Sequence, residues 1–362
     1  MKFRISALTM GIALGGLAWT GYAAAADSSD ARSALAKQDG DADQSKQLEE
    51  VFQAAEKSYS LLKSGDTRLT YSFNYSNTRD ARIDFANATG TNGTEVVTNF
   101  VRNTTDHTFT NTFSFDYGIW DNLTFSVRIP LVAKYSENKS VAAGSYISKE
   151  KTVYGVGDIG LSLRWQPFEV RPGRPSLTLN SSFNLKTGES PYEINPDKDL
   201  STGSGYFSLG FGASLSHVLD PVVLFGSVGY NINFEETGLN QYQGDPTNRN
   251  LNPNQDTLTL SSVNPGDSYS MNMGFAYSLS YDVSMSASYQ MSYSRESVFT
   301  FKDGRSVDSP SSTSGIINMS LGLRMSPTYI VNINAGFGLT EDSPDILLGF
   351  SLPLDLEGLK AE

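Results

Sequence analysis

Large apolar residues recur at every second position through most of this chain. Between Gly205 and Phe234, for example, Phe, Leu, Val and Tyr alternate with Gly, Ser and Asn, and the phase changes once, at Leu219-Asp220-Pro221. Period-two alternation places successive side chains on opposite faces of a β-strand. The pattern therefore predicts strands with one bulky apolar face and one small polar face.

Twelve such runs follow Thr67. They begin near Leu69, Phe109, Leu123, Ile159, Leu177, Phe207, Val222, Tyr269, Val283, Ile317, Tyr329 and Ile346. We expect twelve strands, with ten and fourteen as the nearest alternatives. Turns of a few residues connect the runs on one side, and long polar loops are expected on the other side, at 78–105, 137–153, 188–203, 235–267 and 299–312. This alternation is typical of outer-membrane barrels, whose short turns face the periplasm.

The polar face of the runs argues against a soluble β-sandwich, whose solvated face usually carries charges. Serine, threonine, asparagine and glycine dominate this face, and the outward phase of the central runs holds no charged residue. A lipid-facing wall must hold no charged residue, because Lys or Arg at mid-bilayer costs about 2–4 kcal/mol. Backbone groups in lipid also need partners at every edge, which closure provides. We therefore predict an all-β fold, a closed antiparallel transmembrane β-barrel.

Aromatic residues cluster beside the short turns. Amphipathic rings prefer the lipid–water boundary. The expected periplasmic girdle consists of Tyr117, Trp120, Trp165, Phe168, Tyr281 and Tyr329.

The chain divides into three expected regions. Residues 1–26 have a charged start, an apolar run and an alanine-rich end, which indicates a secretory signal peptide. Residues 27–66 form an acidic periplasmic segment with helical spacing that ends at Gly65, and residues 67–362 form the barrel. The apolar face of the expected helix consists of Leu48, Val51, Phe52, Ala55, Tyr59 and Leu62. This helix plugs the lumen, pairs with sister helices in a coiled coil, or tethers the barrel.

Charge and composition exclude several function classes. The net charge is −12, and removal of Lys2 and Arg4 with the signal peptide takes it to −14, which disfavours a nucleic-acid partner. The chain has no cysteine and two histidines, so we expect no cofactor and no transition-metal site. A cation held by Asp197 and Asp199 is a minor alternative.

Charged residues within the runs fall in the inward phase. The expected pore-lining residues are Arg68, Asp116, Arg128, Lys134, Arg164, Lys186 and Arg324. Arg68, Arg164 and Arg324 lie near the periplasmic end, where two roles are open. They form a basic ring that favours anionic solutes or an acidic plug, or they pair with Asp116 and brace the wall.

An outer-membrane phospholipase is the natural enzymatic alternative, and it needs a histidine beside a serine on the outer face. Ser216 precedes His217, but alternation sends neighbours to opposite faces. Neither His107 nor His217 lies in the motif of that enzyme. We therefore expect no catalytic residues and no enzymatic activity.

Five segments together resemble a known family. They are Tyr117–Pro130, Gly155–Arg164, Lys186–Pro191, Thr202–Gly205 and Asp220–Gly226. The family is the group of outer-membrane transporters named for the MetA pathway of phenol degradation. The resemblance covers roughly residues 67–354. Amyloid-exporting relatives in this group pair a periplasmic helical segment with a twelve-stranded trimeric barrel, which implies a homotrimer here. The end of this chain departs from many such barrels, because Asp355–Glu362 contains no aromatic residue.

We therefore predict a channel or transporter in the outer membrane of a Gram-negative bacterium. It contacts membrane lipid and passes small solutes or an unfolded polypeptide. One alternative is an uptake channel for hydrophobic or aromatic compounds, which predicts apolar inward residues such as Val223 and Phe225. Another is a structural or adhesive barrel whose acidic loops, with Glu235, Glu236, Asp245 and Asp256, meet a partner.

Overall fold

The computed structural model describes residues 61–89, 95–142, 145–171, 173–195, 198–219, 222–243, 258–279, 283–325 and 330–354. Strands and their connections account for all of these residues. None of the described ranges contains a helix, so none holds a helix able to cross a bilayer.

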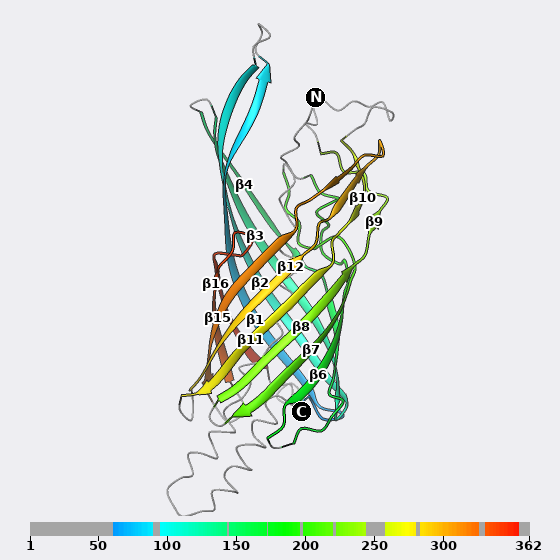
Figure 1. The fold of residues 1–362 in the computed structure, drawn as a ribbon, viewed down its shortest axis with the longest axis vertical. Coiled ribbons are helices and arrows are strands. Elements are labelled where there is room, and N and C mark those ends of the chain that lie inside the picture. Colours follow the sequence, from blue (N-terminus) through cyan, green and yellow to red (C-terminus); the bar gives the residue numbers. More distant parts are fainter. Residues whose placement is uncertain are drawn as a thin grey trace, which may run out of the picture.

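Twelve antiparallel strand positions, which we call staves, close into a single barrel (Figure 1). The strands are β1 (Thr67–Thr89), β2 (Glu95–Trp120), β3 (Leu123–Ala142), β4 (Ser145–Val156), β5 (Gly160–Trp165), β6 (Ser176–Asn184), β7 (Ser208–Leu219), β8 (Val222–Asn233), β11 (Ser268–Ser278), β12 (Val283–Ser294), β15 (Ser312–Arg324), β16 (Ile330–Gly338) and β17 (Ile346–Leu354). β4 and β5 together form one stave, and both pair with β3. The last strand, β17, pairs with β1. The predicted fold and strand count are confirmed.

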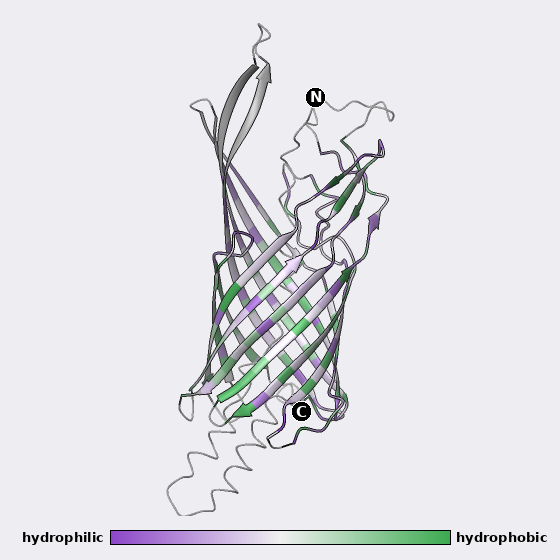
Figure 2. Cartoon of the chain, in the orientation of Figure 1, coloured by the Kyte–Doolittle hydropathy of each residue, from purple (hydrophilic) through white to green (hydrophobic). Residues whose placement is uncertain are grey.

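The barrel wall is apolar outside and polar inside. Phe113 is 39% exposed and Met319 is 53% exposed on the outer face, while the inward Ser72 and Thr124 are 3% and 0% exposed. Figure 2 shows hydrophobic and hydrophilic residues alternating along the staves. The alternation read from the sequence thus places the bulky side chains on the side that meets lipid.

Two of the expected loops are strands instead. β1 and β2 stay paired from Thr67 opposite Tyr117 to Thr89 opposite Glu95, and β3 and β4 pair up to Ala142 opposite Ser145. The loop predictions for 78–105 and 137–153 were therefore wrong. These hairpins project beyond the barrel (Figure 1). Neither face of a hairpin has to be apolar there, so the sequence alternation ends while backbone pairing continues.

A second, four-stranded sheet lies at the same end of the molecule (Figure 1). It consists of β9 (Glu236–Thr237), β10 (Leu260–Asn264), β13 (Val298–Phe301) and β14 (Ser306–Asp308). Its buried apolar cluster contains Leu239, Leu260, Val263, Phe299 and Phe301. We call this sheet and its cluster the cap. It replaces parts of two regions, 235–267 and 299–312, that were expected to be polar loops.

The chain is not helical where it reaches the barrel. The Leu62 N–H donates to Thr124 Oγ1 at 3.1 Å, and the Gly65 N–H donates to the Gly118 carbonyl at 2.8 Å. These donors are bonded to the barrel wall rather than to carbonyls four residues earlier. The helix prediction was therefore wrong for Leu62 to Gly65, while Leu48, Val51, Phe52, Ala55 and Tyr59 lie outside the described residues.

Candidate functional site

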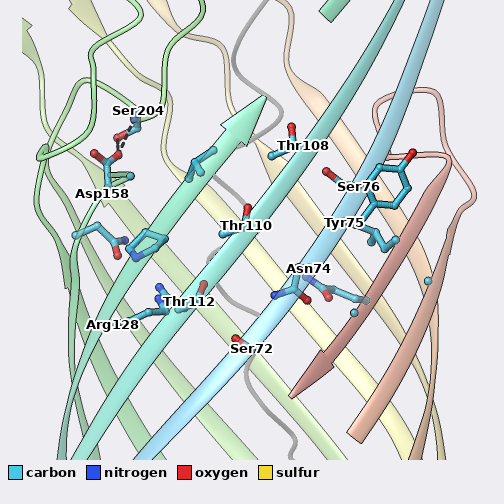
Figure 3. A pocket seen from close by; sticks show the side chains of 18 of the residues that line it. Ser72, Asn74, Tyr75, Ser76, Thr108, Thr110, Thr112, Arg128, Asp158 and Ser204 are labelled. Carbon is cyan, nitrogen blue, oxygen red and sulfur yellow. Dashed lines mark hydrogen bonds between the residues drawn. The ribbon is translucent and has the colours of Figure 1, made fainter. Parts of the chain in front are cut away.

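A cavity of about 410 Å³, lined mostly by polar residues, occupies the barrel interior. Side chains from strands around the whole barrel line it, and most of them are serine, threonine or asparagine. Figure 3 shows Ser72 and Asn74 of β1 beside Thr108, Thr110 and Thr112 of β2, and Arg128 of β3 beneath Asp158 and Ser204. The wall of the cavity is therefore mainly neutral and able to exchange hydrogen bonds.

The connection between β6 and β7 folds inward and narrows the lumen on one side. We call its described residues, 187–195 and 198–206, the inward segment. The Thr202 hydroxyl donates to the Val156 carbonyl at 2.9 Å and accepts from the Glu189 N–H at 2.9 Å. Ser201 to Ser204 line the cavity. The segment thus lies against β3 and β4 rather than standing above the barrel as the expected loop.

Asp158 holds this segment in place. It lies at the break between β4 and β5. Its Oδ1 accepts from the Gly188 N–H at 3.0 Å, and its Oδ2 accepts from the N–H and the hydroxyl of Ser204, both at 2.6 Å. Glycines 188 and 203 allow this approach, because a β-carbon at Gly203 would come within 2.8 Å of the Gly188 Cα. Three of the segments that carried the family resemblance therefore meet at one junction.

Two of the predicted pore-lining cations face the cavity. Lys134 donates from Nζ to the Ser201 carbonyl at 2.6 Å, and Arg128 lies lower on the same strand. Both side chains come from β3, against which the inward segment packs. They bring positive charge to one side of a cavity that is otherwise lined mostly by neutral groups.

The inward segment also contacts the cap. Gln241 donates from Nε2 to the carbonyls of Pro191 and Ile194, at 2.7 and 2.6 Å, and Tyr192 packs against the apolar cluster of the cap. Burial raises the pKa of Tyr192 above its usual value. Burial, together with the nearby Asp158 charge, raises the pKa of Tyr206 to about 12. Both phenols are therefore neutral hydrogen-bond donors at neutral pH.

The periplasmic end carries a compact charge network. Asp116 lies between Arg164, at 3.3 Å from Nη2 to Oδ1, and Arg68, at 3.9 Å from Nε to Oδ2, and it also accepts from the Ser126 hydroxyl. These contacts are the pairing with Asp116 on which one of the two expected roles depends. The side chain of Arg324 is outside the described residues.

The chain enters the barrel along the inner side of β2. A β-carbon at Gly118 would approach the Lys63 carbonyl carbon within 2.8 Å and the Leu62 oxygen within 2.9 Å. Ser64 is bonded to Asp121 and Ile119, and Leu61 is buried. Gly118 thus provides the space for the segment before β1 to cross the periplasmic mouth.

The remaining predicted residues have distinct positions. Of the girdle, Tyr117, Trp120, Trp165 and Phe168 are exposed near the periplasmic turns, while Tyr281 and Tyr329 lie outside the described residues. Lys186 is away from the cavity; it donates to Glu236 at 2.7 Å and lies 5.4 Å from the centre of the Phe207 ring. Asp197, half of the minor cation alternative, also lies outside the described residues, and no cluster suited to a metal occurs within them.

Neither histidine is bonded to a serine within the described ranges. His107 Nδ1 is 2.8 Å from the Tyr75 hydroxyl and 3.3 Å from the Asn77 amide, and His217 Nδ1 is buried without a hydrogen-bond partner. Sequence reasoning missed the roles of Asp158, Gly118 and Gln241. Only the glycines around Asp158 and the presence of Gly118 in a segment of the family resemblance gave a signal, because long-range backbone contacts have no local pattern.

Comparison with known proteins places the chain in a family. The model of a family described as "Putative MetA-pathway of phenol degradation" matches residues 85–355. The chain belongs to this family.

Several solved structures are similar to this chain, and the one with a TM-score above 0.5 supports the fold. A crystal structure of an outer membrane channel from Pseudomonas putida F1 is 14% identical, with a TM-score of 0.53 over 82% of this chain and 97% of that one. The transport unit of the autotransporter AIDA-I from Escherichia coli is 10% identical, with a TM-score of 0.45 over 90% and 98%. A FadL homologue from Pseudomonas aeruginosa is 10% identical, with a TM-score of 0.38 over 80% and 89%.

The barrel is an outer-membrane protein of a Gram-negative bacterium. Its family, its closed antiparallel wall and its exposed apolar outer face agree on this point. Membrane lipid is therefore one partner of the chain.

Proposed function

We propose that this protein is a passive channel for small solutes. The observation that carries the proposal is the polar cavity of about 410 Å³ inside a closed barrel with an apolar outer face. Conduction requires binding that is favourable enough for entry and weak enough for release. Hydroxyls and carboxamides on many strands meet both conditions, because each offers one neutral hydrogen bond. The protein needs no covalent chemistry and no cofactor for this role.

Reconstitution tests the proposal. The full chain in planar bilayers should give discrete single-channel steps, and liposomes containing it should swell in sugars that fit the cavity. The swelling rate should fall steeply as the sugar grows beyond a monosaccharide. A barrel that is folded in the bilayer but passes neither ions nor any sugar would refute the channel.

A second candidate is uptake of hydrophobic or aromatic compounds. The description of the family names phenol degradation, and Val132, Phe225 and Leu347 are apolar residues among the cavity lining. This candidate predicts that liposomes containing the protein accumulate phenol or toluene faster than empty ones, with little discrimination between sugars. Equal accumulation in both kinds of liposome would exclude it. Passage of an unfolded polypeptide remains a third proposal for the same lumen.

We also propose that residues 27–60 act as a plug at the periplasmic mouth. The support is local, because Leu61 is buried and Leu62 is bonded to the inward Thr124. From this position the preceding chain begins at the mouth of the lumen. Residues 27–66 carry nine acidic and five basic residues, which suits a mouth with Arg68 and Arg164 around a single Asp116.

Deletion of residues 27–60 tests the plug and leaves the described crossing at Leu61–Asp66 intact. Conductance should rise severalfold. Replacement of the same residues by a Gly/Ser linker of equal length is the control, and it should give an intermediate value. Unchanged conductance in the deletion would favour a tether. Chemical cross-linking of the full chain in membranes tests the homotrimer and coiled-coil proposals, which predict a trimer that the deletion abolishes.

A further inference from the structure

The cavity has two sides of different chemistry. Cationic side chains, Arg128 and Lys134, lie on β3. Carboxamides lie on β8, β11 and β16, with Asn231, Asn272 and Asn332 among the lining residues. A solute that fills the cavity meets both kinds of group.

Asp158 carries the one carboxylate among the described residues that line the cavity. Both oxygens of Asp158 accept hydrogen bonds from Gly188 or Ser204, so the carboxylate is bonded to the inward segment. Asp106 also lies within electrostatic range of Lys134, but it does not line the cavity. Lys134 donates to a backbone carbonyl and keeps further donors. The lining residues therefore carry two cationic side chains and one carboxylate, a formal net charge of +1.

The amide side offers acceptors. Oδ1 of Asn231, of Asn272 and of Asn332 is buried and has no hydrogen-bond partner within the described residues. The amide nitrogens of Asn231 and Asn332 face Ser268 and Ser351, at 3.4 and 3.5 Å, so their carbonyl oxygens are the atoms left over. A buried acceptor without a partner destabilises the protein. A solute with hydroxyl donors would satisfy these oxygens once the asparagine side chains turn them toward the lumen.

We propose that the cavity is a binding site for a small organic carboxylate rich in hydroxyl groups, such as a sugar acid. The carboxylate pairs with Arg128 and Lys134, and the hydroxyls donate to the asparagine oxygens. The neutral hydroxyl of Tyr206 and the ring of Tyr192 complete the lining near the inward segment. A volume of about 410 Å³ suits one molecule of this size. The proposal rests on the channel function and names its substrate class.

Three solutes of equal size separate charge from shape. Liposomes containing the full chain are given labelled glucuronate, glucose or glucosamine at low ionic strength. Glucuronate should enter about tenfold faster than glucose, because a cleft of opposite charge raises the entry rate of a solute by at least about tenfold. Glucosamine should be the slowest. Equal rates for all three would overturn the proposal and leave the channel standing, whereas no entry of any solute would refute the channel itself.

Variants test whether Arg128 and Lys134 cause the preference for glucuronate. Arg128→Gln with Lys134→Gln should bring glucuronate within about twofold of glucose, because the focusing charge is gone. Arg128→Lys should keep the preference, and Lys302→Gln in the cap, where the ammonium is bonded to Asn240, is the matched control for loss of one charge. Heat-modifiable migration in gels verifies folding of each variant. A preference that survives in a folded double variant would contradict the site.

The amide side has its own test. Asn272→Leu should slow glucuronate and glucose by a similar factor, while hexanoate, an anion without hydroxyls, should keep its rate. If Asn272→Leu slowed all three solutes equally, the change would be a loss of lumen width and not of hydroxyl recognition.

Discussion

The cap and the barrel wall are sheets of the same protein with opposite interiors. The cap buries its apolar residues, with Val263 at 0% and Leu260 at 1% exposure. The barrel buries hydroxyls, with Thr124 at 0% exposure, and turns its large apolar residues outward. The solvent explains the difference. Water surrounds the cap, so its apolar side chains must cover one another. Lipid surrounds the wall, so its apolar side chains need no protein cover.

The largest effect should come from the cap. Phe299→Ala removes a ring that is 3% exposed, and a Phe→Ala change in a core costs about 3–5 kcal/mol. We expect the cap to open while the barrel stays folded. Limited proteolysis should then cut within the cap strands, at residues 260–264 or 298–308, while heat-modifiable migration of the barrel persists. Loss of that migration would mean that the two sheets fold as one unit.

Two arginine substitutions at equally exposed positions compare lipid and water directly. Phe113 on the wall and Val307 in the cap are both 39% exposed. Phe113→Arg should destabilise the folded state by about 2–4 kcal/mol, because its solvent is hydrocarbon. Val307→Arg should change stability by less than about 0.5 kcal/mol, since water already meets that side chain. Urea titration of folding in lipid vesicles measures both, and equal costs would invalidate the contrast.

The periplasmic end is filled by backbone rather than by an apolar cluster, and Gly118→Ala tests this. The methyl group would strike the backbone of Lys63, and overpacking of this kind costs about 1–3 kcal/mol. We expect the crossing segment to detach. Because the chain has no cysteine, Ser64→Cys provides a unique label site whose reaction with a maleimide should accelerate. Gly226→Ala is the control, since its added carbon would lie 3.5 Å from the nearest atom.

The smallest effect should come from the contact between cap and lumen. Gln241→Ala removes two hydrogen bonds to the inward segment and should weaken its attachment by about 1–2 kcal/mol. Open-channel current should become noisier without loss of the mean conductance. Thr300→Ala, which removes a hydroxyl contact within the cap, should leave the noise unchanged. Quiet current in the Gln241 variant would mean that the bonds to the barrel wall, with Asp158 among them, hold the segment without the cap.

Sequence alternation predicted the wall because lipid imposes the same rule on every stave. Phe113, Met273 and Leu321 each point outward for the same reason, so the pattern repeats and is easy to read. Outside the membrane that rule ends. The extended parts of β1 and β2 project beyond the barrel (Figure 1), and their sequence resembles that of a loop although the backbone remains paired.

The cap and the lumen junction could not be predicted for another reason. The strands of the cap come from two connections between staves. Leu260 and Phe299 form one buried cluster only when these connections meet. Asp158 is likewise bonded to groups about 30 and 46 positions away. Such contacts depend on the closed barrel, which brings the connections together. Family resemblance indicated the participating glycines, but not their partners.

Closure of the wall has a consequence for the order of assembly. Leu69 pairs with Leu354, and these two residues are 285 positions apart in the chain. The first stave therefore keeps an unpaired edge until the last nine-residue strand has been exported and inserted. A chain that stops before Ile346 would lack this closing strand and would expose two open edges to lipid, where unsatisfied backbone groups are costly. The folding machinery thus has to shield the N-terminal hairpin for the whole of translocation.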